Sequence, residues 1–332
     1  MSVSLRRKPD KFTLHDSLVS KKQKMPISLL LAIYLILPVS LILVASDIVL
    51  MNNTIRSLLP ANPETTLWYG IIFGLPHILA SMVTLVDREY VSYFKSEFYF
   101  GLPIIFLLTS GLIIFASPIL VFAIMTTFTI IHVVGQQVGI SKILSRQNGI
   151  AFTIWKWCLL ILAVFMMFRV STPQQYWPEN YYWILNVFSI LAVLSLIPFI
   201  WIIIKPMPVS GRWYMASTQL MVVLTLVYAE TGYSFLCILV PRFVHDCSAF
   251  LFYVFHDINR NKNAHHNLLY SLFKIRGKMI LWFIPIFAIG AAAAFNYFLH
   301  PSIIMSIIFF HYFMERKMWR GNSPLRQQIY LK

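Results

Sequence analysis

The chain has 332 residues, of which 58% are hydrophobic and only 12% are charged. Soluble globular proteins carry roughly a quarter charged residues, so this composition excludes an ordinary soluble protein and a disordered chain. It indicates an integral membrane protein. The net charge of +15 would suit a nucleic-acid ligand. Membrane proteins also concentrate basic residues in their loops, however, so the positions of these residues decide what the charge means.

Ten apolar segments follow one another along the chain, each close to the roughly 20 residues that a helix needs to cross a bilayer. Backbone groups in lipid must be hydrogen-bonded within the chain, so runs of this length predict helices rather than strands. The sequence therefore predicts an all-α, polytopic membrane bundle of about ten transmembrane helices. The segments lie near 26–50, 67–86, 98–117, 119–140, 151–170, 182–204, 213–229, 234–256, 279–297 and 302–318.

The basic residues give this bundle an orientation. If the N-terminus is cytoplasmic, 24 of the 27 lysines and arginines fall in cytoplasmic tails and loops, as the positive-inside rule requires. We therefore predict a basic cytoplasmic tail over 1–25, a single transmembrane bundle over 26–320 and a cytoplasmic C-terminal tail over 321–332, in a multi-pass protein of the plasma (inner) membrane. The charge then reports topology, and we expect no nucleic-acid partner.

Four of the nine histidines lie inside apolar segments: His77, His132, His245 and His311. In the predicted topology all four helices run from outside to inside, and each histidine lies roughly 15 Å from the cytoplasmic face. Ionisable groups at mid-membrane are costly and usually functional, and imidazoles from facing helices bind transition metals in helix bundles. We predict a metal site built from these four residues. The alternative is that each histidine is only a hydrogen-bonding group between helices.

Three polar residues lie four positions after one of these histidines, on the same helix face: Ser81, Gln136 and Glu315. Such a neighbour can fix the tautomer of a metal-bound ring, and we predict this role for all three. Glu315 has two further interpretations, as a metal ligand or as a surface ion pair.

Arg242 and Asp246 are also four residues apart and near mid-membrane. The favoured interpretation is a mutually neutralising pair, which lowers the cost of burying both charges. The alternative is that Asp246 orients His245 or a ligand on a neighbouring helix.

A second polar group follows the eighth segment and includes His256, His265 and His266. The HxxHH box of membrane hydroxylases and desaturases is absent, because Lys262 stands where its first histidine would be. His256 lies 11 residues after His245, which is roughly 16 Å along one helix. It cannot share a mononuclear site with His245 unless the helix breaks, so its possible role is at a second site.

The order of these motifs resembles a known family. Gly74-Leu75-Pro76-His77 comes first, Ile131-His132 follows, and a late helix ends with His311 and Glu315. This order is similar to that of the Brp/Blh (bacteriorhodopsin-related protein) family over residues 70–320. Those multi-pass bacterial and archaeal proteins cleave β-carotene to retinal with a non-haem iron held by histidines. The chain departs from the family at Ser81, where the family has an acid, and at Ser248 and Ala249, where it usually has a second histidine.

The resemblance implies Fe(II) as cofactor and a β-carotene 15,15'-dioxygenase-like activity on an apolar substrate that enters from the lipid bilayer. Together with the residues themselves, it predicts a membrane-embedded, histidine-ligated metalloenzyme, a non-haem iron oxygenase of a lipid-soluble substrate such as a carotenoid. The alternative from another class is a transporter or a non-catalytic membrane protein, because intramembrane His, Arg and Asp also form ion or proton pathways.

Overall fold

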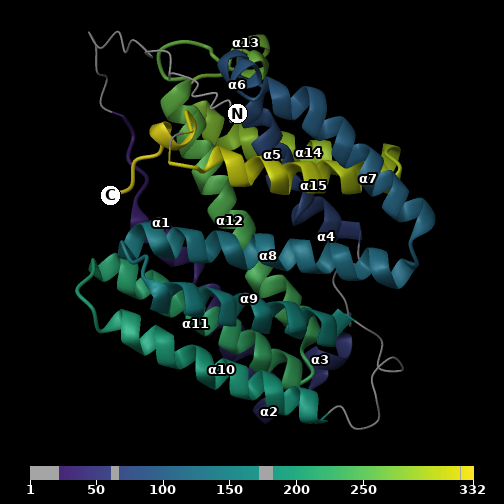
Figure 1. Cartoon of the computed structure of the whole chain (residues 1–332), viewed down its shortest axis with the longest axis vertical. Helices are drawn as coiled ribbons and strands as arrows, with labels where there is room; N and C mark the ends of the chain where they lie inside the picture. The colour runs from purple at the N-terminus through teal and green to yellow at the C-terminus, as the bar shows by residue number, and fades with distance from the viewer. Residues whose placement is uncertain (1–21, 61–66, 172–181, 322) are drawn as a thin grey trace, which may run out of the picture.

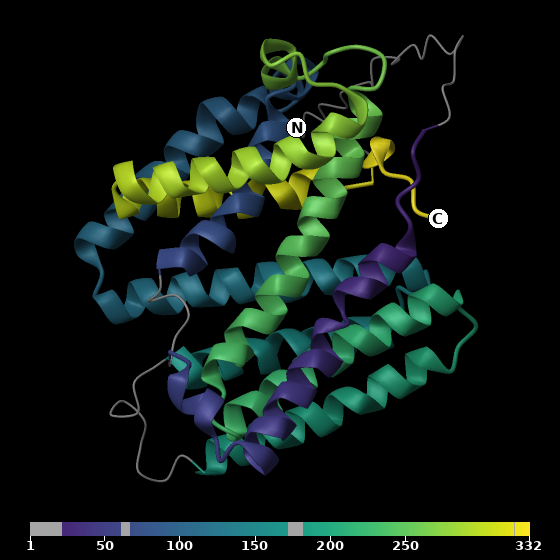
Figure 2. The same cartoon turned by 180° about the vertical axis from the view of Figure 1, so that it is seen from behind.

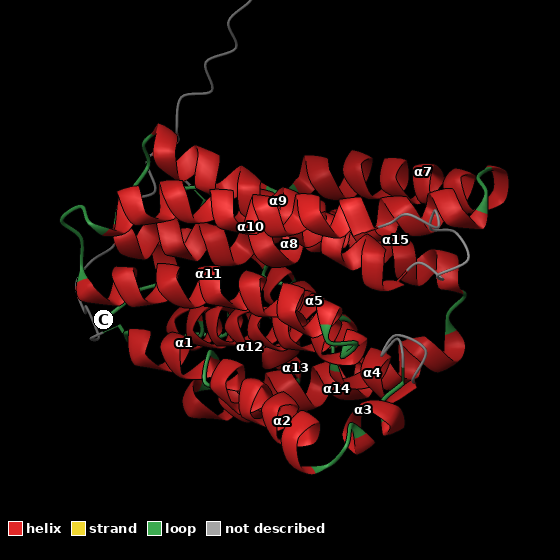
Figure 3. Ribbon diagram, turned by 90° about the horizontal axis from the view of Figure 1, so that it is seen from below, coloured by secondary structure: helices red, strands yellow, loops and turns green. Residues whose placement is uncertain are grey.

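The computed structural model describes residues 22–60, 67–171, 182–321 and 323–332 (Figure 1). Among these residues there are helices, loops and two isolated bridges, but no strand (Figure 3). The α-helices are α1 (Ile27–Ile33), α2 (Ile36–Leu50), α3 (Thr54–Leu58), α4 (Leu67–Ile72), α5 (Leu75–Leu85), α6 (Arg88–Tyr93), α7 (Leu102–Phe115), α8 (Pro118–Ser145), α9 (Ile150–Ser171), α10 (Tyr182–Ile203), α11 (Val209–Glu230), α12 (Ser234–Arg260), α13 (Leu268–Leu272), α14 (Ile280–Phe298) and α15 (Pro301–Met318).

The predicted all-α polytopic bundle is confirmed, and each of the ten apolar segments is helical. Eight of them, within the described residues, are long and apolar enough to cross a membrane. The other two are α11 and α15. Polar residues run through α11, among them Gln219 and Thr225, and α15 ends with Glu315, Arg316 and Lys317. Both are helical, and the count of ten membrane-spanning helices stays a prediction.

The helices form two groups that α12 joins. One group contains α8 to α11 with α1 and α2, and the other contains α4, α5, α7, α14 and α15 (Figures 1 and 2). The obliquely placed α12 packs against α5 and α14 on one side and against α8 and α11 on the other. Two thirds of the residues in the most apolar stretches of α12 and of the α4–α5 pair are buried, against 6% for α7. The centre of the bundle is therefore built by α5 and α12, and α7 faces lipid.

The sequence predicts one continuous helix for the second apolar segment. In the structure this segment breaks between α4 and α5. Gly74 at the break has a φ of +80°, and a Cβ placed there would lie 2.3 Å from Arg242 Nη2. Side chains are strained at such a φ, and a side chain here would also force Arg242 to shift. The break frees the backbone N–H of Gly74 from the helix, and this N–H donates to Asp246 Oδ2 at 2.7 Å.

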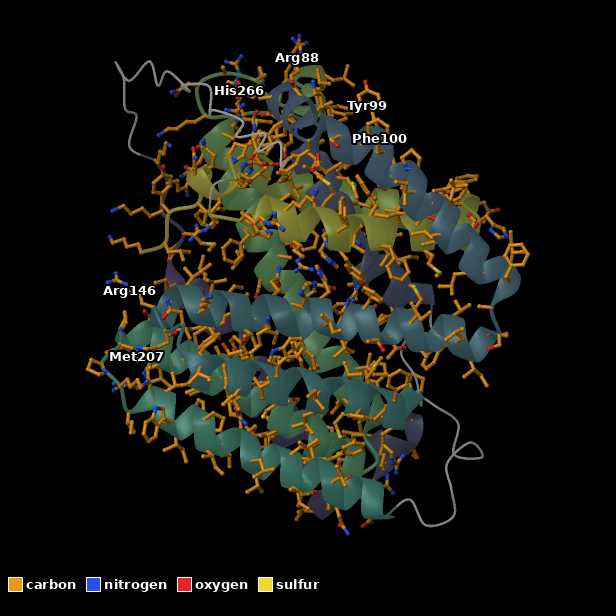
Figure 4. All side chains as sticks on the ribbon, in the orientation of Figure 1. Arg88, Tyr99, Phe100, Arg146, Met207 and His266 are labelled. Atoms are coloured by element: carbon orange, nitrogen blue, oxygen red, sulfur yellow. The ribbon has the colours of Figure 1, made fainter. Side chains whose placement is uncertain are left out.

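The basic end of the bundle is the end that carries the loops after α8, α10 and α12. Figure 4 labels Arg146 and Met207 in the first two of these loops, which lie side by side. The loop after α12 is held to the α5–α6 turn by a backbone bridge between Asp87 and Asn267. The C-terminal residues pack at this end as well, where Met25 pairs with Leu331. The predicted N-terminal tail lies almost wholly outside the described residues, and a cytoplasmic position for this end stays a prediction.

Candidate metal centre

Four helices bring the four intramembrane histidines together. His77 comes from α5, His132 from α8, His245 from α12 and His311 from α15. The ring centroids of five of the six pairs lie between 4.7 and 6.2 Å apart. Three of the side chains are fully buried, and that of His132 is 9% exposed. Figure 4 shows side-chain nitrogens gathered between the ribbons of α8 and α15, where the two groups of helices meet.

The ring nitrogens of these histidines face one another. His245 Nε2 lies 3.2 Å from His77 Nε2, and His311 Nε2 lies 3.3 Å from His132 Nε2. Two nitrogens bound about 2.1 Å from one metal ion are roughly 3.0–3.4 Å apart when the bond angle is between about 90° and 109°. Both distances therefore suit nitrogens that share an ion. Without an ion, an N–H···N hydrogen bond would account for each pair separately.

Polar contacts on the far side of two rings assign their tautomers. His311 Nδ1 lies 2.7 Å from Ser81 Oγ, whose hydroxyl donates to the carbonyl of Ile78. The serine oxygen therefore accepts from His311 Nδ1–H. His77 Nδ1 lies 3.0 Å from Asp246 Oδ1, and the carboxylate at this distance favours a proton on Nδ1. Both rings then carry their proton on Nδ1 and direct the lone pair of Nε2 into the cluster, as metal-ligating histidines do.

Glu315 has one oxygen held in place and one directed at the cluster. Its Oε1 accepts from the Tyr253 hydroxyl at 2.6 Å, and from Gln136 Nε2 and Trp319 Nε1 at 3.3 Å each. Its Oε2 lies 3.1 Å from His132 Nε2. The residue is 4% exposed, so a surface ion pair does not describe it. Three donors on one oxygen leave the other available to a metal ion, which supports the ligand interpretation.

Asp246 contacts the outer nitrogen of a histidine of the site. Oδ2 accepts from the Gly74 backbone, and Oδ1 lies 3.0 Å from His77 Nδ1 and 3.4 Å from Arg242 Nε. The predicted pair with Arg242 is present, and the alternative role is present too, because Asp246 orients a histidine of a neighbouring helix. Two groups of side chains are close enough to hold an ion: His77 with His132 and His311, and His77 with His245 and Asp246. Since Oδ2 accepts from Gly74 and Oδ1 lies between His77 Nδ1 and Arg242 Nε, we take Asp246 as an orienting residue in the second group.

The expected pairing of orienting residues with histidines on their own helix does not occur. Ser81 bonds His311 rather than His77, and Gln136 bonds Glu315 rather than His132. The reason is geometric. Each ring points sideways from its helix toward a common centre, so its outer nitrogen meets the next helix, whereas a residue four positions on lies above or below along the same helix axis. Only Glu315 stays near the histidine one turn before it, 3.9 Å from His311 Nε2.

His256 is not part of this cluster. Helix α12 runs unbroken to Arg260, so it carries His256 away toward the basic end. There Nε2 lies 2.9 Å from the Tyr90 hydroxyl, and Nδ1 lies 2.6 Å from Asp257 Oδ1.

Several residues of the site are not predicted from the sequence. Tyr312 stacks on the His132 ring with centroids 4.2 Å apart, and its hydroxyl bonds Thr129. Trp319 donates its indole N–H to Glu315. Gln137 donates to Gln136 and accepts from the Tyr214 hydroxyl, so it ties the carboxylate's support to α11. The adjacent amides at positions 136 and 137, inside an apolar helix, were the one signal in the sequence.

No protein-family model, no curated protein and no solved structure matches the chain. The function of this site is therefore inferred from the residues that form it.

Proposed function

We propose that the protein is a membrane-embedded metalloenzyme whose metal ion is held by His77, His132, His245, His311 and Glu315. The observation that carries the proposal is the convergence of four buried Nε2 atoms, two pairs of which lie 3.2 and 3.3 Å apart. The polar contacts at Nδ1 of His77 and His311 add to it, since they favour tautomers whose Nε2 lone pairs point inward.

The donor set favours a first-row transition metal. Imidazole nitrogens suit iron, zinc, copper and nickel, whereas magnesium and calcium prefer a shell of oxygens. Four nitrogens and one carboxylate oxygen leave one position of an octahedron open, which suits Fe(II) in a catalytic role. A ferrous ion bound there would supply the activation of dioxygen.

The chain's own residues hold and shield this position. Tyr253, Gln136 and Trp319 fix Glu315, and Ser81 and Asp246 fix two of the rings. The surroundings are apolar and buried, so water is kept from the reacting atoms. Tyr312 lies flat on His132 and limits the space on that side of the ring.

The substrate that this setting favours is apolar. A groove of about 580 Å³ lies between α7 and α15, lined by residues that include Phe106, Leu107, Ile303 and Ile307. Ile307 is four residues before His311 on the same face of α15, so one end of the groove lies one helical turn from that histidine. A lipid-soluble substrate could enter there from the bilayer, and a carotenoid, which the Brp/Blh resemblance implies, is of this class. The protein would act in the plasma membrane.

Metal analysis of the purified protein tests the proposal. We expect about one transition-metal ion per chain after anaerobic incubation with Fe(II), and loss of that ion in the H77A/H132A double variant. The matched control is H300A, which removes an exposed histidine of the turn before α15 and should retain the metal. Absence of bound metal from the wild-type protein, or full retention in the double variant, would refute the proposal. Aldehyde products from a carotenoid in detergent would then test the substrate class separately.

A further inference from the structure

A ladder of polar side chains continues from the candidate centre to the basic end, between α5 and α12. Its first level is Tyr253, which donates to Glu315 and also contacts Ser81. Three residues further along α5, Thr84 donates to Asp257 at 3.1 Å. Since three to four residues make one helical turn, successive levels are about 5 Å apart, a span that one water molecule bridges.

The second level is a buried network around His256 and Asp257. The ring of His256 lies between the Tyr90 hydroxyl at Nε2 and Asp257 Oδ1 at Nδ1, 2.9 and 2.6 Å away. Asp257 Oδ2 accepts from Thr84 and from the hydroxyl of Tyr270. Tyr90 comes from α6, Thr84 from α5 and Tyr270 from α13, so three elements besides α12 contribute a polar group. Burial raises the pKa of Tyr90 and Tyr270, which keeps both hydroxyls protonated as donors.

The third level reaches the surface. Arg260 donates to Asp87 at 2.8 Å and lies 2.7 Å from Glu89, whose side chain is 48% exposed. The Arg260 guanidinium also lies over the Tyr90 ring, 5.2 Å from its centroid. The network around His256 is therefore one contact away from groups that meet solvent.

On α12 the ladder lies on one side of the centre. Beyond the centre, toward the opposite end of α12, the buried residues described on that helix are apolar: Phe235, Leu236, Cys237, Ile238 and Val240. The polar groups that α12 contributes therefore connect the centre with the basic end.

We infer that the ladder is a proton path between the candidate metal centre and the basic end, with the His256–Asp257 pair as its carrier. In one concerted transfer, the Tyr90 hydroxyl accepts a proton from the solvent side as it gives its own to His256 Nε2, while Nδ1–H passes its proton to Asp257 Oδ1. Asp257 then gives a proton up toward Thr84. The ring ends neutral, with the other tautomer, and the reverse sequence carries a proton outward. The inference rests on the proposed metal centre.

Zinc binding provides the test, because a zinc-bound water loses a proton near neutral pH, and zinc also displaces any proton shared between the facing groups of the cluster. Zn²⁺ alone is mixed with the full-length protein in detergent and weak buffer, with one dye reporting free zinc and a second reporting pH. In the wild-type protein we expect proton release to keep pace with zinc uptake. In H256F we expect the same number of protons per zinc, released at least about tenfold more slowly. H300F is the matched control and should behave as the wild type.

Two conservative variants keep the test valid where H256F does not fold. Y90F and T84V each remove one hydroxyl of the ladder with little change in volume, and each should slow proton release without changing zinc affinity. Release as fast in Y90F and T84V as in H300F would overturn the proton path and leave the metal centre standing. A wild-type protein that takes up no zinc would instead refute the metal centre, and the path with it.

Discussion

At the scale of single residues, the site consists of histidine rings, two of which are oriented by polar side chains on neighbouring helices. Ser81 is the clearest example, because its hydroxyl proton is used on Ile78 and its oxygen must accept from His311. Residues that orient a metal-bound histidine contribute about 10- to 100-fold to metal affinity. Removing one of them should therefore weaken the metal without unfolding the protein.

The substitution S81A tests this role. We expect metal affinity to fall about 10- to 100-fold, while the thermal unfolding temperature of the metal-free protein changes little. S302A removes a hydroxyl in the first turn of α15 and serves as the control. Titration with Zn²⁺ in competition with a chelator of known affinity measures both variants. Equal affinities in S81A and the wild type would show that the tautomer of His311 does not matter.

Glu315 allows a sharper distinction, between a ligand and an orienting residue. E315Q keeps the size of the side chain but removes the charge of the oxygen that faces His132. If Glu315 binds the metal, E315Q should lower metal affinity and also alter the absorption spectrum of bound Co²⁺. The exposed Glu230 supplies the control variant E230Q. An unchanged cobalt spectrum in E315Q would exclude Glu315 from the ligand shell.

At the scale of elements, the break between α4 and α5 positions His77. Because Gly74 has a positive φ, its N–H can reach Asp246, which in turn holds the His77 ring. The sequence predicts a continuous segment here, since the apolar residues run through the break. Proline is common in the first turn of a helix, but Gly74-Leu75-Pro76 indicates a helix start only when the backbone conformation of the glycine is known.

G74A should be strongly destabilising. The added methyl group would lie 2.3 Å from Arg242 Nη2 on a backbone conformation that alanine resists, a strain of about 1–3 kcal/mol. G111A is the control, since a Cβ at this position in α7 meets nothing within 4 Å and should be neutral or slightly stabilising. Thermal unfolding in detergent compares the two. Equal unfolding temperatures would mean that the break does not need glycine.

At the scale of the whole molecule, the sequence predicts much of the fold and the identity of the four histidines. Long apolar segments must be helical in lipid, and buried imidazoles are rare enough to be noticed against an apolar background. The partners of His77 and His311 could not be predicted, because they come from other helices and depend on how α5, α12 and α15 pack. The same is true of the ladder around His256, whose members are scattered from Thr84 to Tyr270.

The orientation of the molecule is a further prediction at this scale. The basic loops place the loop after α8 in the cytoplasm and the end of α11 outside. In a variant in which Cys158, Cys237 and Cys247 are serine, R146C should react with an impermeant thiol reagent only after the cells are opened. E230C should react in intact cells. The opposite pattern would invert the topology and place the proton path on the outer side.

The central claim is that four imidazoles and one carboxylate bind one metal ion inside the bundle. X-ray absorption at the iron edge of the Fe(II)-loaded protein tests it most directly. We predict a shell of nitrogen and oxygen atoms about 2.1 Å from the metal, with the outer scattering pattern of four imidazole rings, reduced by one ring in H245A. A shell of oxygen atoms without imidazole scattering, or one that contains sulfur, would contradict the account.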